Sequence, residues 1–154
     1  MRDAFGSTFM FKLIIIFIVM YVTFATIAVS YAKTFRLKNK VIDIIEQSQY
    51  DYMGSSTVDV AFSANSVINE VDKFLARNNY NHREKVEEYC NNTVENGLRS
   101  QVTFQGACIL PIKYKVGKSQ ERYYYRVTLY MVVSIPLINY DAVIPISGET
   151  EDFS

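Results

Sequence analysis

Apolar residues fill one uninterrupted segment near the start of the chain. From Leu13 to Ala32 the sequence carries twenty residues without a charge. A helix rises about 1.5 Å per residue, so this segment spans roughly 30 Å, the thickness of the hydrocarbon part of a bilayer. The pattern predicts a transmembrane helix over residues 13–32, preceded by a short basic tail over residues 1–12.

After this segment the pattern becomes that of an amphipathic helix. Between Lys33 and Gln49 apolar side chains recur every three or four residues, and polar ones fill the other face. No glycine or proline interrupts the chain between Ser7 and Tyr52. We expect one helix of about forty residues, whose second half, residues 33–52, is a stalk in water. The packing stripe of the stalk consists of Leu37, Val41, Ile44 and Ile45, and its wet face includes Lys38, Asn39, Lys40, Asp43 and Glu46.

Two shorter helices are expected early in the remaining domain, residues 53–154. Apolar positions at helical spacing predict a helix over residues 64–77, with Ser63 as its N-cap. The charged segment 83–96 predicts a third helix, closed by Gly97 in the left-handed conformation that glycine favours.

Beyond Gln101 the period changes to two, which predicts strands. Pro145 lacks an N–H and would break an inner ladder, so the last strand is expected at an edge. We expect an antiparallel meander with one face packed on helices and the other in water. The three expected strands are Gln101 to Ile112, Arg122 to Ile135 and Ile138 to Ile146.

Alternation within these strands assigns each side chain to one face of the sheet. Phe104 and Ile144 fall on the core side, and Tyr130 falls on the wet side. The predicted fold class is α+β, with a long N-terminal transmembrane helix continuing into a stalk, one or two short helices and a C-terminal three-stranded antiparallel sheet.

The charge balance argues against nucleic acid as a partner. From Val41 onward the chain carries ten Lys and Arg against fifteen Asp and Glu, whereas a phosphate backbone requires a basic surface. No nucleophile, base or metal cluster is visible, and His82 has no second ligand at helical spacing. We therefore expect no enzyme, no cofactor, no metal and no small-molecule substrate.

The two cysteines admit two states. Cys90 and Cys108 are the only ones in the chain. Outside the cytoplasm they could pair, closing a loop worth ~3 kcal/mol in the loop-entropy model, whereas in a reducing compartment they would be two buried thiols. We favour the disulfide.

The N-terminal segment raises the questions of cleavage and orientation. Ser30 and Ala32 fit a signal-peptidase site before Lys33, but the apolar segment is longer than a signal-peptide core and the helical pattern continues past it, so we expect a retained anchor. Four basic residues follow the span and two precede it, which by the positive-inside rule puts the C-terminal domain in the cytoplasm. A disulfide requires the opposite orientation.

A short charged tail containing Gly6, an apolar run, a helical extension and an antiparallel sheet together resemble type IV pilin-like proteins. More narrowly, the chain resembles the small TadE-like pseudopilins, in the segment Tyr31 to Gln47 and in the terminal strand Val143 to Thr150. Pilins are usually cut after a glycine and carry Glu at the fifth mature position, whereas a cut after Gly6 would put Phe11 there.

This resemblance implies that the C-terminal domain is exported and that the protein is a structural subunit of a membrane-anchored pilus or secretion-type assembly. Its partners would be membrane lipid and, through the N-terminal helix, copies of itself or other pilin-like subunits. The alternative is a single-pass membrane adaptor or accessory subunit, which binds a partner protein through its extracytoplasmic domain.

Overall fold

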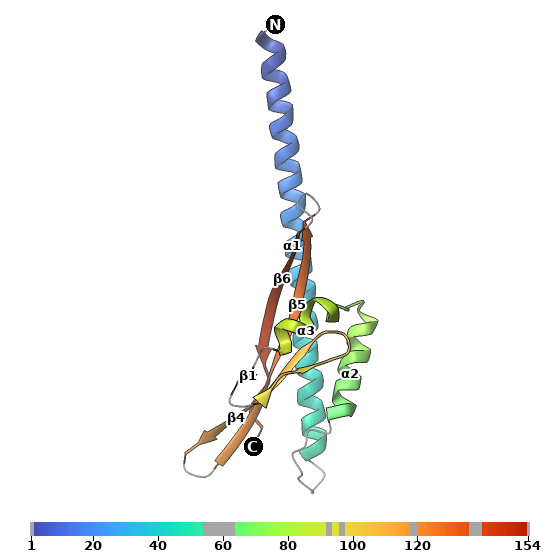
Figure 1. Cartoon of the computed structure of the whole chain (residues 1–154), viewed down its shortest axis with the longest axis vertical. Coiled ribbons are helices and arrows are strands. Elements are labelled where there is room, and N and C mark those ends of the chain that lie inside the picture. Colours follow the sequence, from blue (N-terminus) through green and yellow to red (C-terminus); the bar gives the residue numbers. More distant parts are fainter. Residues whose placement is uncertain are drawn as a thin grey trace. The chain divides into compact units, whose positions relative to one another are not determined.

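The structure is a computed structural model, and it describes residues 2–53, 64–91, 94–95, 98–117, 120–135 and 140–153. The fold class is α+β, as expected. The chain divides into two compact units, Met1–Lys33 and Thr34–Ser154. The elements, most of which are labelled in Figure 1, are α1 (Arg2–Met53), α2 (Ala64–Arg77), α3 (Arg83–Asn91), β1 (Val94–Glu95), β2 (Leu98–Arg99), β3 (Gln101–Val102), β4 (Cys108–Val116), β5 (Gln120–Ile135) and β6 (Tyr140–Glu149).

Helix α1 begins earlier than the sequence pattern suggested. The segment expected as a tail is already helical from Arg2 onward, so Gly6 lies within the helix. Within the described residues, one helical segment, Thr8–Ser48, is long and apolar enough to cross a membrane, as judged by length and composition.

Helix α2 has the expected bounds, and Asn79 explains where it ends. This residue has a φ of 54°, the left-handed conformation that terminates helices. The N–H of Tyr80 then donates to the carbonyl of Leu75 (3.0 Å), so the chain turns back and brings Tyr80 into the interior. Ser63, the expected N-cap, lies outside the described residues.

Helix α3 is shorter than predicted. It ends at Asn91, and part of its expected length is strand β1, whose Val94 and Glu95 pair with β2. Valine has a higher preference for strands than for helices, which agrees with the formation of a strand at Val94 where a helix was expected. Gly97, the expected helix cap, lies outside the described residues.

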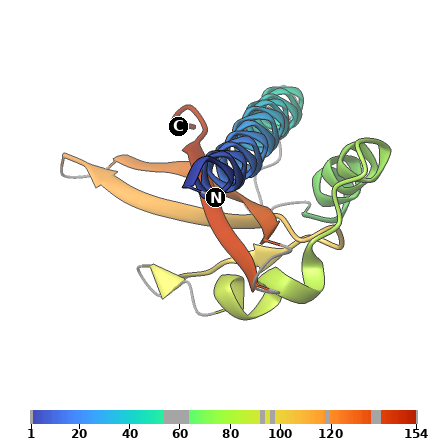
Figure 2. The same cartoon turned by 90° about the horizontal axis from the view of Figure 1, so that it is seen from above.

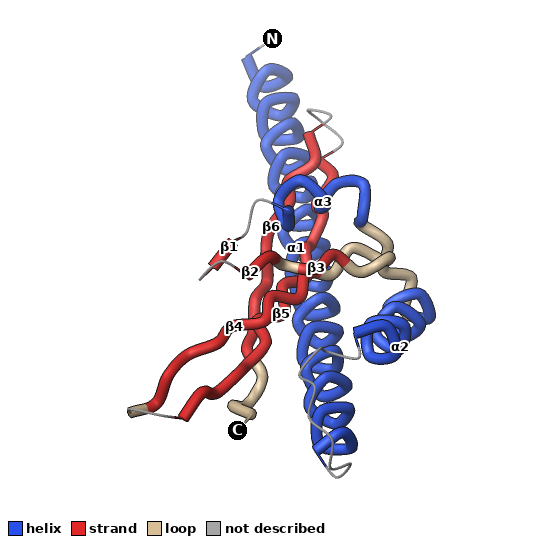
Figure 3. Tube along the Cα trace, turned by 60° about the horizontal axis from the view of Figure 1, so that its bottom comes forward, coloured by secondary structure: helices blue, strands red, loops and turns tan. Residues whose placement is uncertain are grey.

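The main sheet has four antiparallel strands in the order β3-β4-β5-β6, rather than three (Figure 3). The first expected strand was wrong because the chain reverses in its middle, at residues 103–107. Gly106, at a φ of +91°, supplies a conformation that other residues rarely adopt. The turn is closed by hydrogen bonds from the N–H of Thr103 to the carbonyl of Ala107 (2.8 Å) and from the N–H of Gly106 to the carbonyl of Thr103 (3.1 Å).

The prolines of the described strands, Pro111 in β4 and Pro145 in β6, direct their backbone nitrogens away from β5. Tyr125 of β5 forms its backbone hydrogen bonds with Thr150, which follows β6 in the chain. Backbone groups alternate in direction along a strand, so the odd-numbered residues of β5 direct their N–H and C=O groups toward β6 and the even-numbered residues direct theirs toward β4. The register then directs the backbone nitrogens of Pro111 in β4 and Pro145 in β6 away from β5. The edge position predicted for the Pro145 strand is confirmed by the strand order.

Helices cover parts of both faces of the sheet (Figure 2). On one face α1 and α2 contribute to a core with β4 and β5, whose fully buried members include Val41, Ile45, Val71, Leu75 and Val127. On the other face α3 forms a second cluster, which contains Val86, Cys90, Cys108 and Tyr130.

Three side chains differ in burial from what alternation predicted. Tyr130 is buried rather than wet, because α3 covers its side of the sheet. Phe104 is 70% exposed, because it lies in the turn and not in a strand. Ile144 remains 39% exposed, because β6 is an edge strand with a neighbour on one side only.

Candidate functional site

The described part of the first unit exposes an apolar helix surface. Large apolar side chains are exposed in unbroken succession from Ile14 to Val22, which is more than two turns, so they cover the whole circumference of the helix. A helix that is apolar all round is stable in lipid or against other helices. This apolar helix surface consists of Phe9, Met10, Phe11, Ile14, Ile15, Ile16, Phe17, Ile18, Val19, Met20, Tyr21, Val22, Phe24, Val29 and Tyr31.

The stalk residues of α1 contribute to the core of the second unit, three of them as members and one at its margin. Leu37, Val41 and Ile45 are buried, and the last two are fully buried. Ile44 is only partly buried and packs at the margin of this core. The spacing of three and four residues aligned these side chains on one side of α1, and the sheet supplies the matching apolar face.

Lys38 was assigned to the wet side of the stalk and is in fact buried, with 7% of its surface exposed. Its ammonium lies 4.4 Å from the centre of the Phe35 ring and donates to the carbonyl of Ser147 in β6 (3.4 Å). Gly148 makes room for it, because a Cβ there would meet Lys38 Nζ at 2.7 Å. A lysine can bury its long aliphatic part while its charge reaches a polar partner, which periodicity alone does not reveal.

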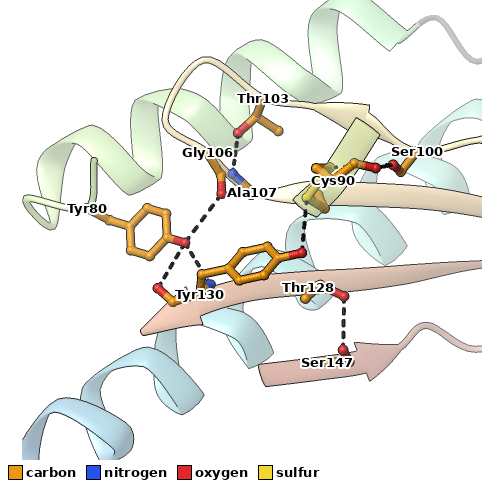
Figure 4. The surroundings of a disulfide bond; sticks show 10 residues. Tyr80, Cys90, Ser100, Thr103, Gly106, Ala107, Thr128, Tyr130 and Ser147 are labelled. Atoms are coloured by element: carbon orange, nitrogen blue, oxygen red, sulfur yellow. Dashed lines mark hydrogen bonds between the residues drawn. A yellow bond between two sulfur atoms is a disulfide. The ribbon is translucent and has the colours of Figure 1, made fainter. Parts of the chain in front are cut away.

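The predicted disulfide joins Cys90 of α3 to Cys108 of β4 across 18 residues (Figure 4). The hydroxyl of Tyr130 lies 3.8 Å from the sulfur of Cys108, and the hydroxyl of Ser100 donates to the carbonyl of Cys90. The disulfide therefore fixes α3 to the sheet at the centre of the second cluster.

A polar contact also connects α3 to the far edge of the sheet. Lys85 of α3 is paired with Asp141 of β6, which also accepts a hydrogen bond from Ser134. The hydrogen bond from Lys85, followed by that from Ser134, lowers the pKa of Asp141. This pair is on the surface, so it adds orientation more than stability.

Tyr80 completes the backbone hydrogen bonds of β5 beyond the point where β4 begins (Figure 4). Cys108, the first residue of β4, pairs with Thr128, so Tyr130 has no strand partner on that side. The hydroxyl of Tyr80 accepts from the N–H of Tyr130 (2.9 Å), and its proton faces the carbonyls of Tyr130 (3.3 Å) and Gly106 (3.4 Å). No sequence motif signals this role, although the left-handed Asn79 that directs Tyr80 inward belongs to an Asn-rich helix end.

The buried phenol of Tyr80 makes the fold sensitive to alkali. Burial raises the pKa of Tyr80 from its usual 10.0 to about 12. The folded state thus holds the phenolic proton more tightly than the unfolded chain, and this stabilisation is fully present below pH 10 and is lost as the pH rises through 12. We expect the full chain in detergent to lose about 2 kcal/mol of stability from this group over that interval.

The variant Tyr80→Phe separates this effect from the other tyrosines. It should cost about 1–3 kcal/mol at neutral pH, because the N–H of Tyr130 loses its acceptor. Its stability should then fall less steeply than that of the unchanged protein between pH 10 and 12, as measured by chemical unfolding. Parallel curves for the two proteins would show that Tyr80 is not the group responsible.

Among the described residues, no group of three or more His, Cys, Asp or Glu side chains is placed to hold a metal ion. His82 stacks edge-on against Tyr80, with 4.8 Å between the ring centres, and so packs against the second unit's interior. A groove between α1 and α2 is lined by Ile44, Glu70, Lys73, Phe74 and Arg77.

Comparison of the chain with protein-family models, with curated proteins and with solved structures finds no match. The functional argument therefore rests on the chain's own residues, above all on the apolar helix surface and on the oxidised, stalk-supported second unit.

Proposed function

We propose that the protein is a pilin-like or pseudopilin-like structural subunit of a membrane-anchored assembly. The observation that carries the proposal is the exposure of the apolar helix surface on a chain whose stalk is packed into a separate folded unit. Each large apolar side chain gains about 1.5–3 kcal/mol on leaving water. Lipid and the equivalent helices of neighbouring copies are the surroundings that supply this gain.

The disulfide supports one orientation of the chain in the membrane. Structural disulfides persist in oxidising compartments and are rare in the cytoplasm, and the one between Cys90 and Cys108 lies in the second unit. This supports a second unit outside the cytoplasm, anchored to the cell membrane by a single span. The basic residues after the span favour the opposite orientation, but their weight falls because Lys38 is used within the fold.

The alternative is a single-pass adaptor that binds a partner protein through the second unit. It is favoured by the hairpin of β4 and β5, on one face of which the rings of Tyr114 and Tyr124 lie 5.8 Å apart. Tyrosine is enriched at protein interfaces because its ring is apolar and its hydroxyl forms hydrogen bonds. An adaptor would form one-to-one complexes and would have no need to bind itself.

Two differently tagged copies of the full chain, made in the same cells, provide the test. If the protein assembles, one tag should recover the other from gently solubilised membranes. Replacement of Ile27 by Ala should weaken this recovery while leaving the melting temperature of the second unit unchanged, because Ile27 lies in the first unit. A maleimide should label Cys90 and Cys108 only after reduction.

Two results would count against the proposal. Absence of the second tag, together with recovery of a different protein, would favour the adaptor. Labelling of both thiols without a reductant would place the second unit in the cytoplasm and remove the basis for export.

A further inference from the structure

The turn between β3 and β4 presents an aromatic ring to solvent. Phe104 is 70% exposed, and the guanidinium of Arg83 lies over its ring, 5.0 Å from the ring centre. Aromatic and arginine side chains carry most of the binding energy at protein interfaces. An exposed ring with a cation beside it is therefore suited to binding a protein surface.

The ring is held outward by its backbone. Asp72 of α2 accepts hydrogen bonds from the N–H groups of Phe104 (3.0 Å) and Gln105 (2.9 Å), and the carbonyl of Gln105 accepts from the N–H of His82 (3.1 Å). On the next residue, Gly106, a Cβ would lie 2.6 Å from the nitrogen of Arg83, so the turn fits closely against the start of α3. Such preorganisation lowers the entropy lost on binding.

A complementary surface lies on the other flank of α2. The helix buries Val71 and Leu75. At 100° per residue, Asp72 projects from one side of this buried stripe, and Phe74 and Glu70 from the opposite side. Phe104 lies on the Asp72 side of α2, because its N–H donates to the Asp72 carboxylate. Phe74 and Glu70, on the other side, line the groove between α1 and α2. One chain therefore cannot place its own ring in its own groove.

The two surfaces also differ in charge. Beside the ring, the first two turns of α3 carry two positive and three negative charges, on Arg83, Lys85, Glu84, Glu87 and Glu88. The groove has an apolar floor of Ile44 and Phe74, and its rim carries Glu70, Lys73 and Arg77, two positive charges and one negative. Opposite net charges on the two surfaces favour their association.

We propose that Phe104 of one copy inserts into the α1–α2 groove of a second copy of this chain, with Arg83 of the first copy facing Glu70 of the second. This rests on the proposed function, because anchoring in one membrane gives all copies the same orientation. The Phe104 ring of one copy can then face the α1–α2 groove of the copy beside it. Since ring and groove lie on opposite flanks of one helix, the contact is head-to-tail and repeats from copy to copy.

Photo-crosslinking of the full chain in membranes tests the contact. A photoreactive benzophenone residue in place of Phe104 should yield a ladder of dimers and larger species, with the new bond at Ile44, Phe74 or their neighbours in the second copy. The same residue in place of Val116, which is also exposed, should yield no such ladder. Bonds from position 104 to the same chain, to other proteins or to other parts of the second copy would overturn the proposal.

Charge exchange provides an independent measurement. Glu70→Arg alone and Arg83→Glu alone should each reduce the crosslinked dimer, by about tenfold where the pair is desolvated, and the double exchange should restore it. Equal melting temperatures would show that all variants are folded. Failure of the double exchange to restore the dimer would overturn the pairing.

The tagged-copy experiment separates the two proposals. If differently tagged copies still bind one another but position 104 gives no bond to the groove, the assembly stands and this contact is wrong. If the copies do not bind one another at all, the proposed function and this contact fail together.

Discussion

Replacing Ile45 by Asp is expected to unfold the second unit, Thr34–Ser154. The side chain is fully buried in the core formed with α2 and the sheet. An Asp there loses the apolar contacts and leaves a carboxyl group with no hydrogen-bonding partner, at a cost of about 4 kcal/mol or more. A loss of this size removes most of the stability of a domain near the lower end of the usual range of about 5–15 kcal/mol. The loss of the tyrosine near-ultraviolet circular dichroism of the full chain in detergent measures it.

Ile44→Asp is the matched control, because this residue is adjacent on the same helix and only partly buried. Its carboxylate can turn toward the groove, so the melting temperature should fall without loss of the fold. A variant Ile45→Asp with the melting temperature of the unchanged protein would show that the stalk is not packed into the core.

Gly106→Ala should be nearly as damaging, although it adds one carbon atom. The new Cβ would lie 2.6 Å from the nitrogen and 2.9 Å from the Cα of Arg83, and 2.9 Å from the carbonyl carbon of His82. All three are backbone atoms, which cannot move aside as a side chain could. The positive φ of this position adds backbone strain for any residue with a Cβ. We therefore expect the free energy of unfolding to fall by about 3 kcal/mol or more, as measured by chemical unfolding.

Gly117→Ala separates the steric contact from the backbone strain. Gly117 also has a positive φ, of 70°, but nothing lies within 4 Å of the Cβ position. This variant should cost only about 1–2 kcal/mol, the ordinary penalty of a left-handed residue. Equal losses for the two variants would mean that the contact with Arg83 carries no weight.

Much of the second unit could be predicted from periodicity, because periodicity reports on one face of one element. The stripe containing Val41 and Ile45 is buried, and α2 has the bounds that its apolar positions indicated. The single strand predicted from Gln101 to Ile112 was wrong, because apolar alternation ran through the turn and counted Phe104 as a core residue. The conformational signal available there was Gly106.

The remaining errors concern contacts between elements, which local patterns do not contain. Tyr130 is buried because the disulfide holds α3 on its face of the sheet, and Lys38 is buried because Gly148 leaves room for it on a strand more than a hundred residues away. The polar role of Tyr80 depends on where β4 begins. The apolar helix surface of α1 could be expected from composition, whereas the positions of the Phe104 ring and of the groove required the three-dimensional structure.

The outward-facing prolines of the sheet have a consequence for crowded copies. An edge strand with unused N–H and C=O groups is a template for cross-β growth, and such growth is difficult to reverse. Pro145 removes a donor from one edge and Lys38 occupies the neighbouring carbonyl of Ser147, while Pro111 removes a donor from β4. If copies are concentrated in one membrane as proposed, these features oppose sheet-to-sheet fusion and leave contacts between side chains and helices reversible.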